Sequence, residues 1–89
     1  MKGYYKKTDD FDVRYDSFLI SLNDINDKNS EFFQERKIKG HQYDTAQKCV
    51  LIGRGHNLEN TVEIGFYPES DLQSSIKNEI LDLFRRYFE

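Results

Sequence analysis

The C-terminal third of the chain reads TVEIGFYPESDLQSSIKNEILDLFRRYFE (residues 61–89). Its first seven residues alternate, with every second side chain apolar, and this pattern predicts a strand. KCVLIGR (residues 48–54) is another short apolar run rich in β-formers, and the polar segment GHNLEN (residues 55–60) between them suits a hairpin loop. The two runs therefore predict an antiparallel hairpin. Gly53 and Gly65 fall within its strands, where a missing side chain permits a bulge or close packing by a neighbour.

The residues after this hairpin predict a capped helix. Pro68 ends the second strand, and Ser70 with Gln73 matches the capping box that opens many helices. We expect the helix to run from about Asp71 to Phe88. Its apolar residues fall within an arc of roughly 120° at 100° per residue, which is the width of a core-facing stripe. The arc comprises Leu72, Ile76, Ile80, Leu83, Phe84 and Tyr87, and it is expected to pack on the sheet.

Leu81 and Phe88 lie beyond this arc, at roughly 160–180° on the helical wheel. A helix packed on a single sheet does not need a second apolar stripe. Two alternatives remain open for these residues. Either the first segment of the chain covers them, or they form an interface with a partner or with a second copy of the chain.

The first third of the chain alternates like a strand. In VRYDSFLISL (residues 13–22), Phe18, Ile20 and Leu22 share one face and Val13, Tyr15 and Leu19 share the other, which predicts a strand. The segment that follows, residues 23–30, is dense in Asn and Asp and marks a turn or a helix start.

EFFQERKIK (residues 31–39) fits either a short helix capped by Ser30 or an irregular strand, and Gly40 ends it. The sequence as a whole predicts one α+β domain over residues 1–89. It would consist of a small antiparallel sheet of three to four strands packed against the C-terminal amphipathic helix.

Composition narrows the class of protein. The chain has 89 residues, a net charge of −3, 15% aromatic residues and a single cysteine. The aromatic content favours a folded chain, because disordered segments carry few aromatics. The single cysteine forms no internal disulfide, and neither a signal peptide nor an apolar run of membrane-spanning length is present. These observations predict a cytoplasmic protein without membrane partners.

The residues that carry site chemistry form no recognisable motif. His41, Asp44, Cys49 and His56 are the residue types of a nucleophilic or metal site, but they lack the short ligand spacings of such sites. We therefore expect no enzyme activity, no cofactor and no metal.

The leading functional hypothesis is a non-enzymatic protein-binding module. Small size, an acidic balance and surplus aromatics are typical of inhibitors, immunity proteins, antitoxins and phage-encoded antagonists of host enzymes, a nuclease among them. An acidic segment near aromatic residues is the expected partner-binding surface. It comprises Asp9, Asp10, Asp12 and Asp16 with Tyr4, Tyr5 and Tyr15, and Leu81 and Phe88 would extend it or support a homodimer.

The alternative hypothesis is a small nucleic-acid-binding or regulatory protein. A modest basic strip with an aromatic residue for stacking would carry that function. It comprises Lys37, Lys39, Tyr43, Lys48 and Arg54. The net charge and the lack of a nucleic-acid-binding motif make nucleic acid the less favoured partner.

Overall fold

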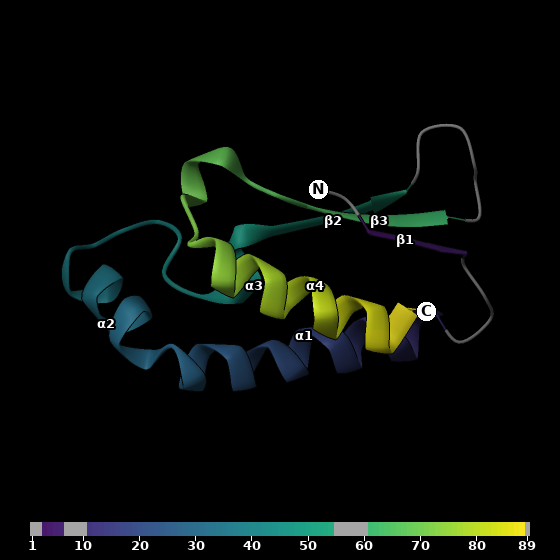
Figure 1. Cartoon of the computed structure of the whole chain (residues 1–89), viewed down its shortest axis with the longest axis horizontal. Coiled ribbons are helices and arrows are strands. Elements are labelled where there is room, and N and C mark those ends of the chain that lie inside the picture. Colours follow the sequence, from purple (N-terminus) through teal and green to yellow (C-terminus); the bar gives the residue numbers. More distant parts are fainter. Residues whose placement is uncertain (1–2, 7–10, 55–60, 89) are drawn as a thin grey trace.

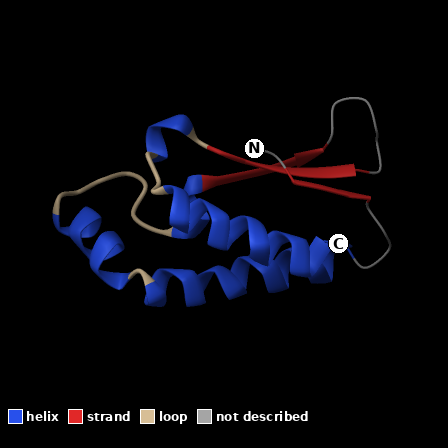
Figure 2. Cartoon of the chain, viewed as in Figure 1, coloured by secondary structure: helices blue, strands red, loops and turns tan. Residues whose placement is uncertain are grey.

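The computed structural model is a layered α+β structure (Figures 1 and 2). It describes residues 3–6, 11–54 and 61–88, and for residues 3–6, 11, 54, 61 and 62 it describes the backbone alone. The elements are β1 (Gly3–Lys6), α1 (Phe11–Lys28), α2 (Ser30–Ile38), α3 (Ala46–Cys49), β2 (Val50–Arg54), β3 (Thr61–Phe66), the 3₁₀ turn η1 (Pro68–Ser70) and α4 (Ser74–Phe88).

The sheet is small and antiparallel, with the strand order β1-β3-β2. The register pairs Val50 with Phe66 and Ile52 with Ile64, while Gly3 of β1 lies opposite Ile64 on the other side of β3. The predicted antiparallel pairing of the two runs and the α+β class are therefore confirmed, while the predicted loop, residues 55–60, lies outside the described residues.

The two strand glycines neither form a bulge nor receive a close neighbour. Residues pair one to one along the whole β2–β3 ladder, from Val50 with Phe66 to Arg54 with Val62. A Cβ built on Gly53 or Gly65 would meet no atom within 4 Å. Strand alternation places both glycines on the face opposite the buried Ile64, so the prediction of close packing was wrong.

The predicted strand over residues 13–22 was wrong, because this segment lies within α1. The side chains that α1 buries, Phe18, Leu22 and Ile25, recur at helical spacing. Ile20, which the strand pattern placed beside Phe18, is 69% exposed. The strand-like alternation arose by coincidence, because exposed aliphatic residues lie between the buried apolar residues of the helix in the sequence.

The Asn- and Asp-rich segment does not end α1 before Lys28, because its polar side chains make tertiary contacts. The Asn26 carboxamide accepts the Ala46 N–H (2.7 Å) and donates to the Gln47 side chain (2.8 Å), which fastens α1 to α3. Asn29 donates to the Ile25 carbonyl (2.9 Å). Asn and Asp residues disfavour helical conformation locally, and these contacts hold them in or beside the helix.

The helical alternative holds for the next segment, α2. Its N-cap is Asn29 and not the predicted Ser30, which is the first helical residue. The predicted end at Gly40 is confirmed, since this glycine has φ +70° directly after the C-cap Lys39. A positive φ suits glycine, which has no Cβ to clash.

The last helix begins three residues later than its capping box predicts, at Ser74. Ser70 is fully buried and donates its hydroxyl to the Tyr67 carbonyl (2.6 Å), so it does not cap α4. η1 ends there, and Asp71 takes a left-handed conformation with φ 45°. The predicted end at Phe88 is confirmed.

α4 lies between the sheet and α1 (Figure 1), and it therefore needs two apolar sides. The Phe18 ring of α1 lies 5.8 Å from the Phe84 ring and 5.7 Å from the Phe88 ring, centroid to centroid. On the sheet side, the Lys77 ammonium lies 5.9 Å from the Phe66 ring centroid. Packing of the whole predicted arc on the sheet was therefore wrong, because Phe84 faces α1.

Leu81 and Phe88 are core residues, with exposed fractions of 4% and 0%. Phe88 contacts Phe18, and Leu81 lines a hollow on the sheet side together with Phe66. Coverage by the first segment of the chain describes Phe88, which contacts Phe18 of α1, whereas Leu81 is buried beside Phe66 of β3. The expectation that these two side chains form a partner interface or a homodimer interface is corrected by their burial.

The helical assignment of residues 13–22 can be tested with two substitutions on what would be one strand face. Phe18→Ala should lower the free energy of unfolding by about 3–5 kcal/mol, because it leaves a cavity against α4. Ile20→Ala should change it by less than about 0.5 kcal/mol, because Ile20 faces solvent. Urea unfolding measures both. Equal losses would contradict the helix.

The burial of the second stripe of α4 predicts that Phe88→Asp unfolds the protein. The carboxylate would lie unpaired among the rings of Phe18 and Phe84, a penalty of several kcal/mol. Asn78→Asp is the matched control, because it adds the same charge at an exposed position of α4. Circular dichroism melting distinguishes them. A Phe88→Asp protein as stable as the control would show that this residue is not core.

Candidate functional site

One side of α1 carries a set of acidic and aliphatic residues that faces solvent. At 100° per residue these positions fall within an arc of roughly 120° that contains no basic residue. We call this set the acidic face of α1. It comprises Asp12, Val13, Asp16, Ile20, Asn23, Asp24 and Asp27.

The acidic face of α1 is exposed and unneutralised. Val13 and Ile20 are each 69% exposed. Within the described part of the chain, none of the four aspartates forms an ion pair or a hydrogen bond through its side chain. These four charges alone exceed the net charge of −3 of the whole protein. From Asp12 to Asp27 the stripe extends about 22 Å, at 1.5 Å per residue.

The inner side of α1 holds this face in place. Phe18 is buried against α4, and Ser21 Oγ shares a hydrogen bond of 2.5 Å with the Tyr87 hydroxyl. Arg14 donates to the Tyr87 carbonyl (2.7 Å). Because the helix is anchored along its length, the acidic face is presented on a rigid element.

The structure separates the acidic residues that the sequence grouped with aromatics. Asp12 and Asp16 lie on the acidic face, whereas Tyr15 packs half-buried against the core and is not part of that surface. Asp9 and Asp10 lie outside the described residues. Tyr4 and Tyr5 belong to β1, and their side chains lie outside the description.

Five members of the acidic face were missed by the sequence reasoning: Val13, Ile20, Asn23, Asp24 and Asp27. The strand prediction turned Val13 and Ile20 toward opposite faces. It also ended the element before the last two aspartates. A helical wheel drawn through residues 11–28 would have found all five, because they share one side only at 100° per residue.

Two lysines of the predicted basic strip are paired with carboxylates. Lys39 pairs with Glu35 (2.7 Å) and Lys48 with Asp44 (2.9 Å). Hydrogen bonds from these lysines lower the pKa of the Glu35 and Asp44 carboxyls below their ordinary values. Lys37 donates to the Asp44 carbonyl (2.6 Å). The Arg54 side chain lies outside the described residues.

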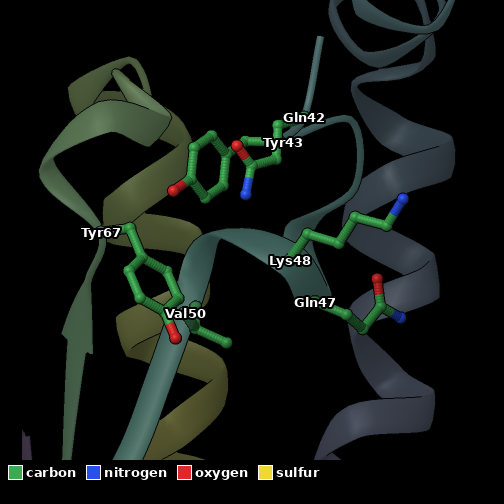
Figure 3. A pocket seen from close by; sticks show the side chains of 6 residues that line it. All are labelled: Gln42, Tyr43, Gln47, Lys48, Val50 and Tyr67. Atoms are coloured by element: carbon green, nitrogen blue, oxygen red, sulfur yellow. The ribbon is translucent and has the colours of Figure 1, made fainter. Parts of the chain in front are cut away.

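One end of this strip borders a pocket of about 550 Å³ (Figure 3). Its walls come from the segment before α3, from α3, from the start of β2 and from the residue before η1. They comprise Gln42, Tyr43, Gln47, Lys48, Val50 and Tyr67. Two predicted strip residues, Tyr43 and Lys48, thus line the pocket together with Tyr67, which sequence reasoning did not connect to them.

Backbone hydrogen bonds position the two tyrosines of the pocket. Arg36 donates to the Tyr43 carbonyl (2.8 Å), and the Tyr43 N–H donates to His41 Nδ1 (3.0 Å). The Tyr67 N–H donates to the Cys49 carbonyl (3.0 Å). The two rings lie 5.8 Å apart, centroid to centroid, and are inclined by 33°.

Cys49 and His41 do not form a nucleophilic pair. Cys49 is fully buried, its thiol donates to the Thr45 carbonyl (3.2 Å), and burial raises its pKa to about 11. A buried neutral thiol is unreactive. His41 accepts a backbone N–H through Nδ1, and His56 lies outside the described residues.

The described residues contain no group of three or more His, Cys, Asp or Glu side chains arranged to hold a metal ion. No helix in the same residues combines the length and apolarity that crossing a bilayer requires.

The raised pKa of Cys49 predicts a loss of stability at high pH. Below about pH 9 the thiol is neutral in both the folded and the unfolded chain. Between about pH 9 and 11 the unfolded chain ionises first, so the free energy of unfolding falls, by up to roughly 2–3 kcal/mol. Urea titrations across this window, compared with Cys49→Ala, isolate the effect. Parallel curves for the two proteins would contradict it.

Comparison with known proteins assigns this chain to no family. No protein-family model, no curated protein and no solved structure matches it. Its function is therefore argued from the acidic face of α1 and the pocket.

Proposed function

We propose that this protein is a non-enzymatic protein-binding module and that the acidic face of α1 binds a basic surface of its partner. The observation that carries the proposal is a set of four exposed aspartates whose side chains have no partner among the described residues, arranged around the exposed Val13 and Ile20. A solvated helix face needs charge, but it gains nothing from two aliphatic side chains that are 69% exposed.

Charge and apolar contact would contribute differently to binding. The aspartates would steer a positively charged partner toward α1 and raise the association rate at low salt. Val13 and Ile20, seven residues apart, project from the same side of the helix two turns apart. They would bury apolar area once the partner is docked, as the anchors of a helix do in a groove.

The same charges constrain what the partner is. Two copies of the acidic face would repel each other, which disfavours a homodimer through this surface. Nucleic acid would be repelled in the same way, because its backbone is anionic. A basic protein surface remains, such as the active-site cleft of a nuclease. Inhibitor, immunity-protein, antitoxin or phage-antagonist roles all fit a small module that blocks such a cleft.

Site-specific photo-crosslinking in the native host tests this proposal. A photoreactive phenylalanine analogue at Ile20 should crosslink a partner protein, and the same analogue at Ile38 should not. Ile38 is the matched control, because it is also an exposed isoleucine on a helix, 85% exposed on α2. Adducts of equal yield at both positions would contradict the proposal.

The charge dependence can then be measured with the captured partner. Replacing Asp12, Asp16, Asp24 and Asp27 by Asn should leave the fold intact and slow association at least tenfold at low salt. It should also flatten the salt dependence of the association rate. Glu69→Gln on η1 is the control for loss of an exposed charge away from α1. An unchanged rate in the fourfold variant would refute the role of the acidic face.

A further inference from the structure

The pocket beside the tyrosines is not explained by protein binding through α1. Its volume of about 550 Å³ lies within the range of small-molecule sites, roughly 300–1,000 Å³. Val50, which is 8% exposed, forms an apolar wall. Gln47 contributes only its aliphatic stem, because its carboxamide donates to the Leu19 carbonyl and to Asn23 Oδ1 of α1.

The aromatic groups of the pocket remain available to a planar ligand. Tyr67 is 37% exposed. The 33° inclination of its ring to that of Tyr43, at 5.8 Å between centroids, leaves the two faces incompletely covered by each other. Their backbones are fixed by hydrogen bonds, so little ordering entropy would be lost on binding. Figure 3 shows both rings beside the hollow, with the Gln42 carboxamide next to Tyr43.

Three polar groups of the pocket have no hydrogen-bond partner among the described residues. They are the Tyr43 hydroxyl, the Tyr67 hydroxyl and the Gln42 carboxamide. A carboxamide offers two donors and one acceptor, and each hydroxyl offers one donor and acceptor sites. This set complements the mixed donor and acceptor edge of a heteroaromatic ring.

Lys48 lines the pocket, and a second lysine, Lys37, binds the same residue as Lys48 does. Lys37 and Lys48 both bond to Asp44, the first through its carbonyl (2.6 Å) and the second through its carboxylate (2.9 Å). Two ammonium groups beside one carboxylate leave a positive excess. The Lys48 side chain is 58% exposed, so this pair is weak and open to exchange with another anion.

We propose that this pocket binds a nucleotide, with the base against Tyr43 and Tyr67 and the phosphate at Lys48. The ligand chemistry is that of one planar base joined to one anionic group, whether as a free nucleotide or as one unit of a single strand. A single nucleotide is favoured over an extended strand along the basic residues, because Lys39 does not line the pocket and the acidic face of α1 repels phosphate.

The test is a nuclear magnetic resonance titration of the labelled full chain with AMP, adenosine and inorganic phosphate. AMP at millimolar concentration should shift the backbone amides of Gln42, Tyr43, Lys48 and Tyr67. Adenosine should shift the same amides at higher concentration, and phosphate alone should shift Lys48 most. AMP that leaves these amides unmoved, or that moves amides elsewhere, would overturn the proposal.

Variants separate the two halves of the site. Tyr67→Ala should weaken AMP binding roughly fivefold or more, because a base–aromatic contact is lost. Lys48→Gln should weaken AMP binding but not adenosine binding. Lys39→Gln, the matched control, removes a neighbouring lysine that is not in the pocket and should change neither. If the Tyr67→Ala protein bound AMP as tightly as the parent, stacking of the base on Tyr67 would be overturned. Normal binding of AMP by Tyr67→Phe would not change that conclusion.

Oligonucleotides identify the source of the ligand. A short deoxyadenosine oligomer that binds more tightly than AMP, with a steeper salt dependence, supports a strand unit. An oligomer that binds no better than AMP at the same four amides supports a free nucleotide. An oligomer that shifts only the amides of α2 and not the pocket would overturn the proposal. These outcomes do not depend on whether α1 binds a partner, so the two proposals fail separately.

Discussion

The structure depends on the insertion of Phe18 of α1 among the rings of α4. Phe18, Phe84 and Phe88 are all fully buried, and edge-on arrangements of this kind contribute about 0.5–1.5 kcal/mol each beyond the burial of their area. Only 37% of the residues are hydrophobic, so few other apolar contacts are available to hold the sheet, α4 and α1 together. This packing fixes α1 on one side of α4 and leaves the sheet on the other. It thereby fixes which side of α1 faces solvent.

The local sequence predicted the elements whose signals agree at short range. The hairpin and the end of α4 at Phe88 follow from alternation and helical periodicity within single segments. The start of α4 did not, because burial of Ser70 outweighed its preference for a cap position. α1 failed for a related reason. The exposed Val13 and Ile20 gave the segment a strand-like pattern, and only contact with α4 shows that Phe18 and its helical neighbours are the core stripe.

The candidate sites show the same division. Composition alone pointed to Asp12 and Asp16, because an acidic cluster is visible without a fold. Asp24 and Asp27 join them only when α1 is a continuous helix, which the Asn- and Asp-rich segment concealed. Tyr67 and Tyr43 lie far apart in the chain, and no spacing rule connects them. Their contact exists because the turn after β3 and the segment before α3 meet at one end of the sheet.

The two proposed surfaces share one structural link. Gln47 forms a wall of the pocket, and its carboxamide is held by Leu19 and Asn23 of α1, the latter on the acidic face. The placement of α1 therefore sets both the direction of the acidic face and the width of the pocket. Electrostatically the surfaces are opposed, since one repels the phosphate that the other would hold. That opposition favours two different ligands on one rigid frame over a single extended partner covering both.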